Sequence, residues 1–205
     1  MIDLIIFDLG NVILNFDHMI ICKKLSKLSK FPLQEVYERI FSSGLERLYD
    51  EGKISTKDFF KEISNRFGLN ISLTEFKLLW QDIFWVNEGI EEILLKLKGR
   101  YKLFLLSNTN ELHFEFAKDK FDILNLIDEY ILSYKVGFSK PSPEIFYEAL
   151  KKAKVDASRC IYIDDIKEHV ISANKVGMKG VLFKSIDGLK RNLAKYGVKL
   201  YSTPL

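Results

Sequence analysis

Short apolar runs that alternate with helical patterns constrain the fold of this chain more than any other feature of its sequence. The runs lie at residues 4–7 (LIIF), 103–106 (LFLL), 130–132, 160–163 and 180–183. Runs of this length without alternating polar residues are typical of strands that are covered on both faces, as in a parallel sheet. Because strands that alternate with helices form βαβ units, the pattern predicts an α/β fold with a Rossmann-like, doubly wound parallel sheet.

The helices between the later runs are marked by apolar spacing and by residues that start or stop a helix. Apolar residues at helical spacing occupy one face of residues 90–97. Ser142 and Pro143 are the residue types of an N-cap and a first helical position. A further stripe over residues 170–176 is followed by Gly177, a residue that favours the end of a helix.

A block from about residue 19 to 85 interrupts this alternation, and its spacing predicts an all-helical structure. Ser55 and Ser72 each precede an acidic residue by three positions, which is the spacing of a capping box. We therefore predict a catalytic core built from residues 1–15 and 87–205, with residues 16–86 inserted as a small helical cap. The many aromatic residues of the cap are interpreted as its own core, with a substrate-facing wall as the alternative.

Two tryptophans lie at the end of the predicted last cap helix. Trp80 and Trp85 are interpreted as packing in the core or at the hinge, with stacking against a sugar as the alternative.

Composition narrows the function classes. The chain has 205 residues, which suits about one domain, and a net charge of +3 is too small to argue for nucleic acid or an anionic membrane surface. A membrane span needs roughly 20 consecutive apolar residues, and the runs here are far shorter. The first residues carry Asp3 and Asp8 and no basic segment before the apolar run, which is unlike a signal peptide. The only cysteines, Cys22 and Cys160, form no CxxC pair, so we expect a reducing, cytoplasmic location.

Polar residues follow three of the apolar runs at the points where the predicted strands end. They are Asp8, the pair Ser107-Asn108 and the pair Asp164-Asp165. Ligands of open α/β sheets bind outside the carboxyl ends of the strands, so these side chains are expected to meet, and Lys140 is expected to join them from a loop. Carboxylate oxygens suit Mg²⁺, and a lysine with a hydroxyl and backbone N–H groups suits a phosphoryl group.

Each of these residues also has a simpler interpretation. Asp8 could be a strand-end carboxylate without a partner, and Ser107 or one aspartate of the pair at 164–165 could cap a helix. Lys140 could be an ordinary surface lysine. The functional interpretation depends on all four features meeting at one edge.

The motifs as a set resemble the haloacid dehalogenase (HAD) superfamily, in order and over the whole chain. The strings that carry the resemblance are FDLGNVI (7–13), EGKIS (51–55), LSNTNELH (106–113), KPSPEIF (140–146) and DDIKEHVISANKVGM (164–178). Within the superfamily they look most like the sugar-phosphate phosphatase branch that includes the bacterial α-D-glucose-1-phosphate phosphatases, with kinship to the phosphatase domain of soluble epoxide hydrolase.

This resemblance implies a role for each motif residue. Asp8 would be the nucleophile that forms an aspartyl-phosphate. Mg²⁺ would be held by Asp8, by the backbone carbonyl of Gly10 and by Asp165. Asp164 would support that site through other ligands or a water molecule. Ser107, Asn108 and Lys140 would bind the phosphoryl oxygens, with Lys140 also acting in catalysis. The expected substrate is a small phosphorylated metabolite, a sugar phosphate in particular; the oligomeric state stays open.

Gly10 is a departure from the family, because most members carry an acidic residue at that position as general acid and base. The group that protonates the leaving oxygen is therefore open, with Asp17, His18, His113 and solvent as candidates. His113 is also a possible substrate contact, with a histidine on a helix surface as the equal alternative. His169 stands where relatives often have asparagine or aspartate, and it is interpreted as solvent-facing or helix-lining.

Three functions compete at this point. The first is a Mg²⁺-dependent phosphatase. The second is a haloacid dehalogenase, which shares the nucleophile but needs no metal and lacks the paired carboxylates of Asp164-Asp165. The third is a weakly active HAD fold that serves in binding or regulation, for which Gly10 is the only support. Retention of Asp8, Ser107 and Lys140 argues against the third.

Overall fold

The five apolar runs form the parallel sheet that their pattern predicts. In the computed structural model, which describes residues 1–200, the order of the strands is β5-β4-β1-β6-β7 and every pairing is parallel. The strands are β1 (Leu4–Phe7), β4 (Lys102–Ser107), β5 (Glu129–Leu132), β6 (Cys160–Asp164) and β7 (Lys179–Leu182). Leu4 lies opposite both Lys102 and Cys160, so β1 is the central strand and its neighbours β4 and β6 end beside it.

Helices cover both faces of the sheet, as a doubly wound fold requires. Alternate residues of β1 point to opposite faces, with Ile5 and Phe7 in one apolar cluster and Leu4 and Ile6 in the other. The first face is covered by α6 (Ile90–Leu97), α7 (Glu111–Lys120), the 3₁₀ turn η2 (Asp122–Leu126) and α11 (Ile186–Lys195). The second face is covered by α9 (Pro143–Ala153) and α10 (Lys167–Lys175). Two short elements, α8 (Ser133–Val136) and the 3₁₀ turn η3 (Ala157–Arg159), complete this part of the chain.

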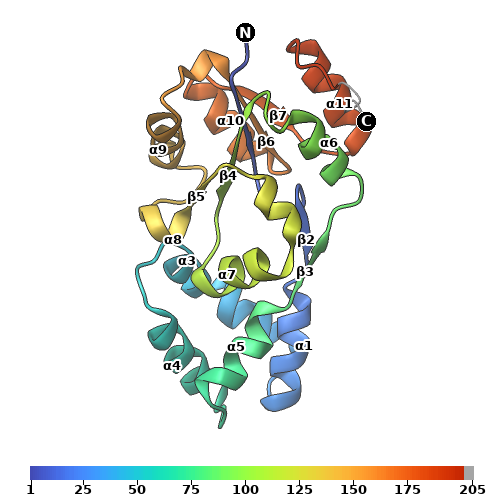
Figure 1. The fold of residues 1–205 in the computed structure, drawn as a ribbon. Coiled ribbons are helices and arrows are strands. Elements are labelled where there is room, and N and C mark those ends of the chain that lie inside the picture. Colours follow the sequence, from blue (N-terminus) through green and yellow to red (C-terminus); the bar gives the residue numbers. More distant parts are fainter. Residues whose placement is uncertain (201–205) are drawn as a thin grey trace.

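The inserted block folds into a helical cap at one end of the sheet, seen in the lower half of Figure 1. It comprises α1 (Met19–Leu28), α2 (Leu33–Tyr37), the π-helical turn η1 (Glu38–Ser42), α3 (Leu45–Asp50), α4 (Thr56–Phe67) and α5 (Leu73–Gln81). Ser72 and Glu75 form the complete capping box at the start of α5, and the Ser55 hydroxyl accepts the Asp58 N–H at the start of α4. The aromatic residues of the cap, including Phe59, pack mainly against one another.

One prediction about the inserted block is wrong, because it is not helical throughout. β2 (Leu14–Phe16) and β3 (Phe84–Val86) pair antiparallel as a two-stranded ribbon that carries the chain into and out of the cap. Trp85 therefore lies on a strand and is half-exposed, whereas Trp80 is fully buried on α5. The prediction of packing in the cap core is therefore confirmed for Trp80. Trp85 lies instead on the ribbon between the core and the cap.

The segment EGKIS, directly after α3, contacts the core. Gly52 has a φ of +66°, and a Cβ at this position would overlap the backbone carbonyl oxygen of Tyr134. The Ser139 hydroxyl donates a hydrogen bond of 2.5 Å to the carboxylate of Glu51. The helical block thus lies at the end of the sheet where β1, β4 and β6 have their carboxyl ends and where the predicted site lies.

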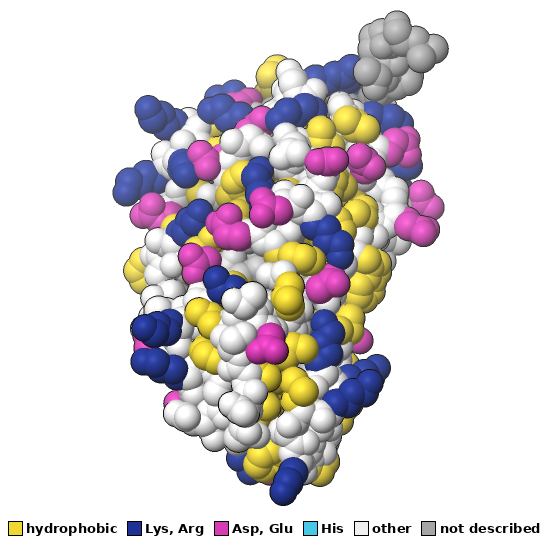
Figure 2. Space-filling view, turned by 60° about the horizontal axis from the view of Figure 1, so that its bottom comes forward, with side chains coloured by type: hydrophobic (Ala, Val, Ile, Leu, Met, Phe, Trp, Pro, Cys, Tyr) yellow, Lys and Arg dark blue, Asp and Glu magenta, His cyan; other side chains and the backbone are white. Residues whose placement is uncertain are grey.

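The face in Figure 2 carries charged side chains of both signs. They are mixed in its upper half, and basic side chains are the more frequent in its lower half. Within residues 1–200, every helix is too short or too polar to cross a membrane.

Candidate active site

Asp8 stands at the carboxyl end of the central strand and is almost completely buried, with 6% of its surface exposed. Its backbone N–H donates to the carbonyl of Ile163 at 2.8 Å, which extends the pairing of β1 with β6 by one residue. Its Oδ1 accepts a 2.7 Å hydrogen bond from the N–H of Leu9. The strand and the following turn together fix the direction of this carboxyl.

Lys140 lies between two carboxyl groups. Its Nζ is 2.8 Å from Oδ1 of Asp8 and 2.8 Å from Oδ2 of Asp164, and it donates to the carbonyl of Leu106 at 3.3 Å. Only 1% of its side chain is exposed. The interpretations of Lys140 as a surface lysine and of Asp8 as a carboxylate without a partner are therefore wrong.

Asn108 fixes the loop that carries Lys140. Its side-chain Oδ1 accepts the N–H of Lys140 at 2.7 Å, and its Nδ2 donates to the carbonyl of the same residue at 3.0 Å. The peptide bond that follows, to Pro141, is cis. The side chain of Asn108 is thus used in positioning Lys140, which leaves its backbone N–H as the group available to a phosphoryl oxygen.

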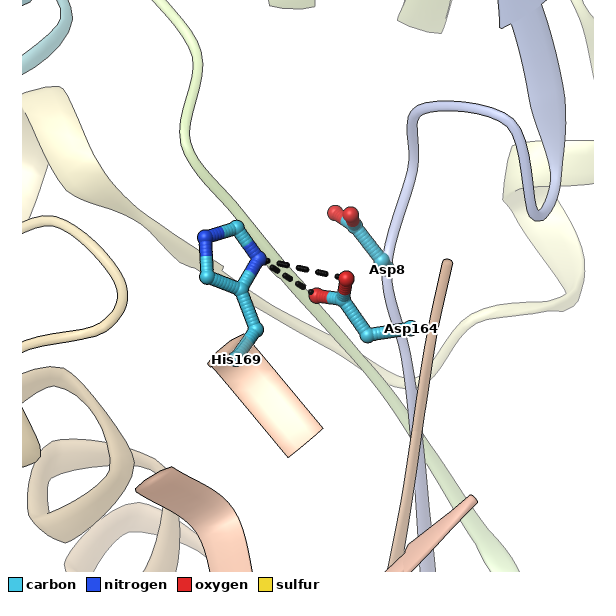
Figure 3. A group of neighbouring side chains, drawn as sticks. All are labelled: Asp8, Asp164 and His169. Carbon is cyan, nitrogen blue, oxygen red and sulfur yellow. Dashed lines mark hydrogen bonds and ion pairs between the residues drawn. The ribbon is translucent and has the colours of Figure 1, made fainter. Parts of the chain in front are cut away.

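Asp164, at the end of β6, holds several groups together. Besides Lys140 it accepts hydrogen bonds from the Tyr162 hydroxyl, from the N–H of Ile166 at 2.7 Å and from Nδ1 of His169 at 3.0 Å. Figure 3 shows His169, from α10, facing both oxygens of Asp164 with Asp8 alongside. The interpretation of His169 as solvent-facing is wrong: it is 8% exposed and directed at the site.

The charges in this network are unequal. Burial raises the pKa of Asp8 to about 8; Lys140 lowers it, and Asp164 and Asp165 raise it. Burial also opposes the charge of Asp164, but Lys140 and His169 hold the pKa of that carboxyl well below its usual range. Asp8 and Asp164 thus share the ammonium of Lys140, but only Asp164 is also stabilised by His169, so its pKa is lowered while that of Asp8 stays raised.

A cavity of about 250 Å³ opens in front of these groups. The predicted residues that line it are Asp8, Gly10, Ser107, Asn108, Lys140 and Asp165. Ser107 is buried at the end of β4, and its hydroxyl donates to the carbonyl of Asn108 at 3.2 Å. It caps no helix, since the N-cap of α7 is Asn110. The structure thus brings all the predicted phosphate-binding and metal-binding residues to one cavity.

One group of donors beside this cavity is already occupied by protein. Single donor atoms of Asp8, Asp164 and His169 lie within 4.8 Å of one another. Both oxygens of Asp164 already have protein partners, however. The ammonium of Lys140 would also repel a metal ion placed among Asp8, Asp164 and His169.

A second group of donors fits a divalent cation better. Asp8, Gly10 and Asp165 line the same open cavity. The carboxylate of Asp165 accepts one hydrogen bond, 3.0 Å from Nδ2 of Asn11, a residue held at a φ of 53°. Carboxylate and carbonyl oxygens are the ligands that Mg²⁺ prefers in proteins.

A second cavity, of about 100 Å³, lies between the core and the cap. From the core it is lined by Gly10, Ser107 and Asn108, and from the cap side by His18, Glu46 and Asp50. Glu46 and Asp50 were absent from the sequence-based site. Their four-residue spacing places them on one face of α3, but only the packing of α3 against the core directs that face to the site.

Both histidines beside this cavity are uncharged. Burial lowers the pKa of His113 to about 3 and that of His18 to about 4. Nε2 of His113 must carry the proton, because it lies 3.0 Å from the carbonyl of Trp80; Nδ1 then accepts from Nδ2 of Asn110 at 3.1 Å. A ring with both nitrogens engaged can contact a substrate only through its carbon edge or face. As a surface histidine it would be exposed, and it is 4% exposed.

The three side chains considered as proton donors are thus poorly suited to the task. Both histidines are neutral near pH 7, and a neutral imidazole is too weak an acid to protonate a leaving oxygen. The carboxylate of Asp17 is directed at its own helix, where Oδ1 accepts the N–H of Met19 at 2.8 Å.

The family model of the haloacid dehalogenase-like hydrolases matches residues 2–177. The chain belongs to this family. The chain is similar to the D-ribitol-5-phosphate phosphatase of Bacteroides thetaiotaomicron, with 28% identity over 87% of this chain and 90% of that enzyme. The glyceraldehyde 3-phosphate phosphatase of Pyrococcus abyssi is 24% identical over 90% of this chain and 82% of its own length.

A solved structure supports the fold assignment. A HAD family enzyme from Bacteroides thetaiotaomicron, in complex with magnesium and inorganic phosphate, superimposes with a TM-score of 0.81. It is 25% identical, and the match covers 91% of this chain and 96% of that one. The chain is therefore a HAD-family hydrolase with the expected α/β fold. Its assignment to the glucose-1-phosphate phosphatase branch stays a prediction.

Proposed function

We propose that this hydrolase is a Mg²⁺-dependent phosphatase that acts on a small sugar or polyol phosphate through an aspartyl-phosphate intermediate. The observation that carries the proposal is the contact of Asp8 with Lys140 at 2.8 Å inside a cavity that Ser107 and Asn108 also line. A carboxylate, an ammonium, a hydroxyl and a backbone N–H are the groups that nucleophilic attack on a phosphoryl group requires.

The reaction would proceed in two displacements at phosphorus. A carboxylate oxygen of Asp8 forms a bond to phosphorus while the bond to the leaving oxygen breaks, and the leaving oxygen takes up a proton. Water then attacks the phosphorus of the aspartyl-phosphate, which releases inorganic phosphate and restores Asp8. Lys140, the hydroxyl of Ser107 and the N–H of Asn108 bind the phosphoryl oxygens and are most effective when negative charge shifts in the transition state.

Mg²⁺ would be held by Asp8, the carbonyl of Gly10 and Asp165, the donors that share the open cavity. When bound, it screens the repulsion between an anionic nucleophile and an anionic phosphate. This assignment agrees with the electrostatics, because the pKa of Asp8 stays raised although it shares Lys140 with Asp164, and a bound cation would favour its ionised form.

We also propose that residues 16–86 act as the cap that shields the reaction from water. The β2–β3 ribbon connects this block to the core, and cap residues complete the second cavity. A narrow connection of two strands suits a hinge, and closure over the leaving group would exclude solvent from the phosphoryl group. The buried, unpaired Cys22 and Cys160 support a reducing, cytoplasmic location.

The substrate class rests on the relatives together with the cavity. The two phosphatase relatives are named for ribitol 5-phosphate and glyceraldehyde 3-phosphate, which are small phosphorylated polyols or sugars. Polar residues of the second cavity, such as Glu46 and Asp50, suit the hydroxyl groups of such molecules.

A phosphate-release assay tests the proposal. Purified protein is incubated with ribitol 5-phosphate and with 4-nitrophenyl phosphate, in Mg²⁺ and in excess chelator, and a parallel reaction with 2-chloropropionate is assayed for halide. We expect phosphate release that requires Mg²⁺ and falls by roughly 10³-fold or more in Asp8→Asn. Halide release without metal would point to a dehalogenase. Release of neither product by a folded protein would overturn the proposed function.

A further inference from the structure

The second cavity, where the leaving group of a bound phosphate ester would lie, has apolar walls from Leu9, Phe16 and Phe84 beside its polar residues, and it contains no permanent positive charge. Its lining residues all belong to the described range 1–200, and neither lysine nor arginine is among them. The titratable residues that line it are His18, Glu46, Asp50 and His113. Glu46 and Asp50 also line a neighbouring cavity of about 220 Å³ together with Arg47 and Lys140. Both of these cations already have carboxylate partners, since Arg47 pairs with Glu51 and Lys140 pairs with Asp8 and Asp164.

Glu46 and Asp50 each have an oxygen available to a ligand. Oε1 of Glu46 lies 3.3 Å from Nε2 of His18, and Oδ1 of Asp50 accepts a 2.9 Å hydrogen bond from Nδ2 of Asn110. Within residues 1–200, Oε2 of Glu46 and Oδ2 of Asp50 have no hydrogen-bond or ion-pair partner in the protein. Both residues line the cavity from one face of α3, together with Ser107 and Asn108 of the core, so these are the oxygens that a ligand in the cavity could bind.

The electrostatics of this wall favour uncharged ligand groups. Burial raises the pKa of Glu46 well above its usual range and that of Asp50 to about 7, and each carboxyl lies near other acidic groups. The two histidines are neutral. A protonated or partly protonated carboxyl can both donate and accept a hydrogen bond, as a hydroxyl group does.

We propose that Glu46 and Asp50 form a leaving-group subsite that selects neutral, hydroxyl-bearing leaving groups and rejects those with a second anionic group. The inference rests on the proposed phosphatase function and adds its specificity. A hydroxyl can satisfy the free oxygens of both residues. A carboxylate or second phosphate would lose its hydration in a cavity that has no lysine or arginine in its lining, beside cations that already have carboxylate partners, and it would face two acidic groups, which is strongly unfavourable.

A matched set of substrates tests this selection on the wild-type enzyme in Mg²⁺. Ribitol 5-phosphate, ribonate 5-phosphate and 1-amino-1-deoxyribitol 5-phosphate share one skeleton and differ only in a terminal hydroxymethyl, carboxylate or ammoniomethyl group. We expect kcat/KM for the hydroxymethyl compound to exceed that for the carboxylate by about tenfold or more. Comparable values for these two would overturn the subsite. A tenfold preference for the amine would also overturn it, because the carboxyls would then form an ammonium site.

A change of charge at the subsite gives a result that a merely structural role would not produce. Glu46→Lys places a cation in the cavity and should raise the ratio of kcat/KM for ribonate 5-phosphate to that for ribitol 5-phosphate by about tenfold or more. Glu38→Lys makes the same change at an exposed position of the cap and should leave the ratio within about threefold. An equal effect of both variants would overturn the assignment to Glu46.

The two proposals fail in different ways. If Glu46→Lys does not fold, as judged by circular dichroism, the wild-type substrate ratio still decides the selection. Hydrolysis of ribitol and ribonate 5-phosphates at equal rates removes the subsite and leaves the phosphatase. Failure to hydrolyse these esters and 4-nitrophenyl phosphate removes the phosphatase itself.

Discussion

A Cβ atom at Gly10 would lie 2.7 Å from Cε1 of Phe16. The backbone of Gly10 is outside the left-handed region, so glycine is needed here for space and not for conformation. The ring of Phe16, from the β2–β3 ribbon, thus fills the position from which most of the family projects an acidic side chain. The absence of a general acid at Gly10 and the presence of Phe16 are two aspects of one packing arrangement.

This contact makes Gly10→Asp a test of packing as well as of catalysis. The new side chain must displace the Phe16 ring, so we expect a loss of about 1–3 kcal/mol in the free energy of unfolding, typical of overpacking. Gly10→Ala, which adds the Cβ without the charge, should lose a similar amount. In Gly10→Asp combined with Phe16→Ala, a double-mutant cycle by urea unfolding should show a favourable coupling of about 1 kcal/mol or more. Additive losses would mean that the ring yields without strain.

Lys140 is expected to contribute both to stability and to turnover. Lys140→Met keeps the length of the side chain but leaves Asp164, which is fully buried, without its cation, at a cost of about 3 kcal/mol in unfolding free energy. Adding Asp164→Asn removes the stranded charge and should recover at least half of that loss. Turnover should stay at least 10²-fold below wild type in both variants. Recovery of activity along with stability would show that Lys140 acts only in folding.

The adjacent residues Asp165 and Asp164 are expected to have different roles, Asp165 as a metal ligand and Asp164 as a structural residue. Asp165→Ala should raise the Mg²⁺ concentration needed for half-maximal activity by about tenfold or more, with little change in stability, since Asp165 has one protein hydrogen bond. Asp164→Ala removes the partner of Lys140, His169 and Tyr162 and should lower the free energy of unfolding by about 3 kcal/mol. Mg²⁺ titrations and urea unfolding of both variants check this. A larger metal effect in Asp164→Ala would exchange the two assignments.

The core of the site could be predicted from the sequence because parallel strands deliver their ends to one edge. Asp8, Ser107 and Asp164 each follow an apolar run directly, so locating the strands was enough to place these side chains together. The contact of Lys140 with two of them depends on a loop conformation held by Asn108. The sequence therefore predicts that these residues lie together, but only the structure shows the ion pairs of Lys140 with Asp8 and Asp164.

Features that depend on contacts between distant segments escaped prediction. β3 continues the aromatic spacing of α5, so Phe84 was included in a helical stripe, and only its pairing with β2 makes it a strand. Glu46 and Asp50 have a spacing that fits many solvated helices. His169 was placed toward solvent because an isolated histidine is often partly exposed, and its burial follows from Asp164 on a neighbouring strand.

The stability of the protein should depend on pH through Asp50, in a direction that its burial determines. The pKa of Asp50 is about 7 in the folded state, above its usual value of 3.8, so between about pH 4 and 7 the folded state keeps a proton that the unfolded state has lost. Stability from this group is therefore present at low pH and is lost as pH rises through that window.

The variant Asp50→Asn tests this dependence, because it keeps the size of the side chain and an acceptor for Asn110 but removes the titrating carboxyl. The free energy of unfolding of Asp50→Asn minus that of wild type should grow by about 4 kcal/mol between pH 4 and pH 8. Urea unfolding across this range measures the difference, and Asp119→Asn, the same change at an exposed site on α7, controls for the substitution. A difference for Asp50→Asn that stays constant with pH, or that shrinks as pH rises, would show that Asp50 is ionised in the folded protein and would place a negative charge at the leaving-group subsite.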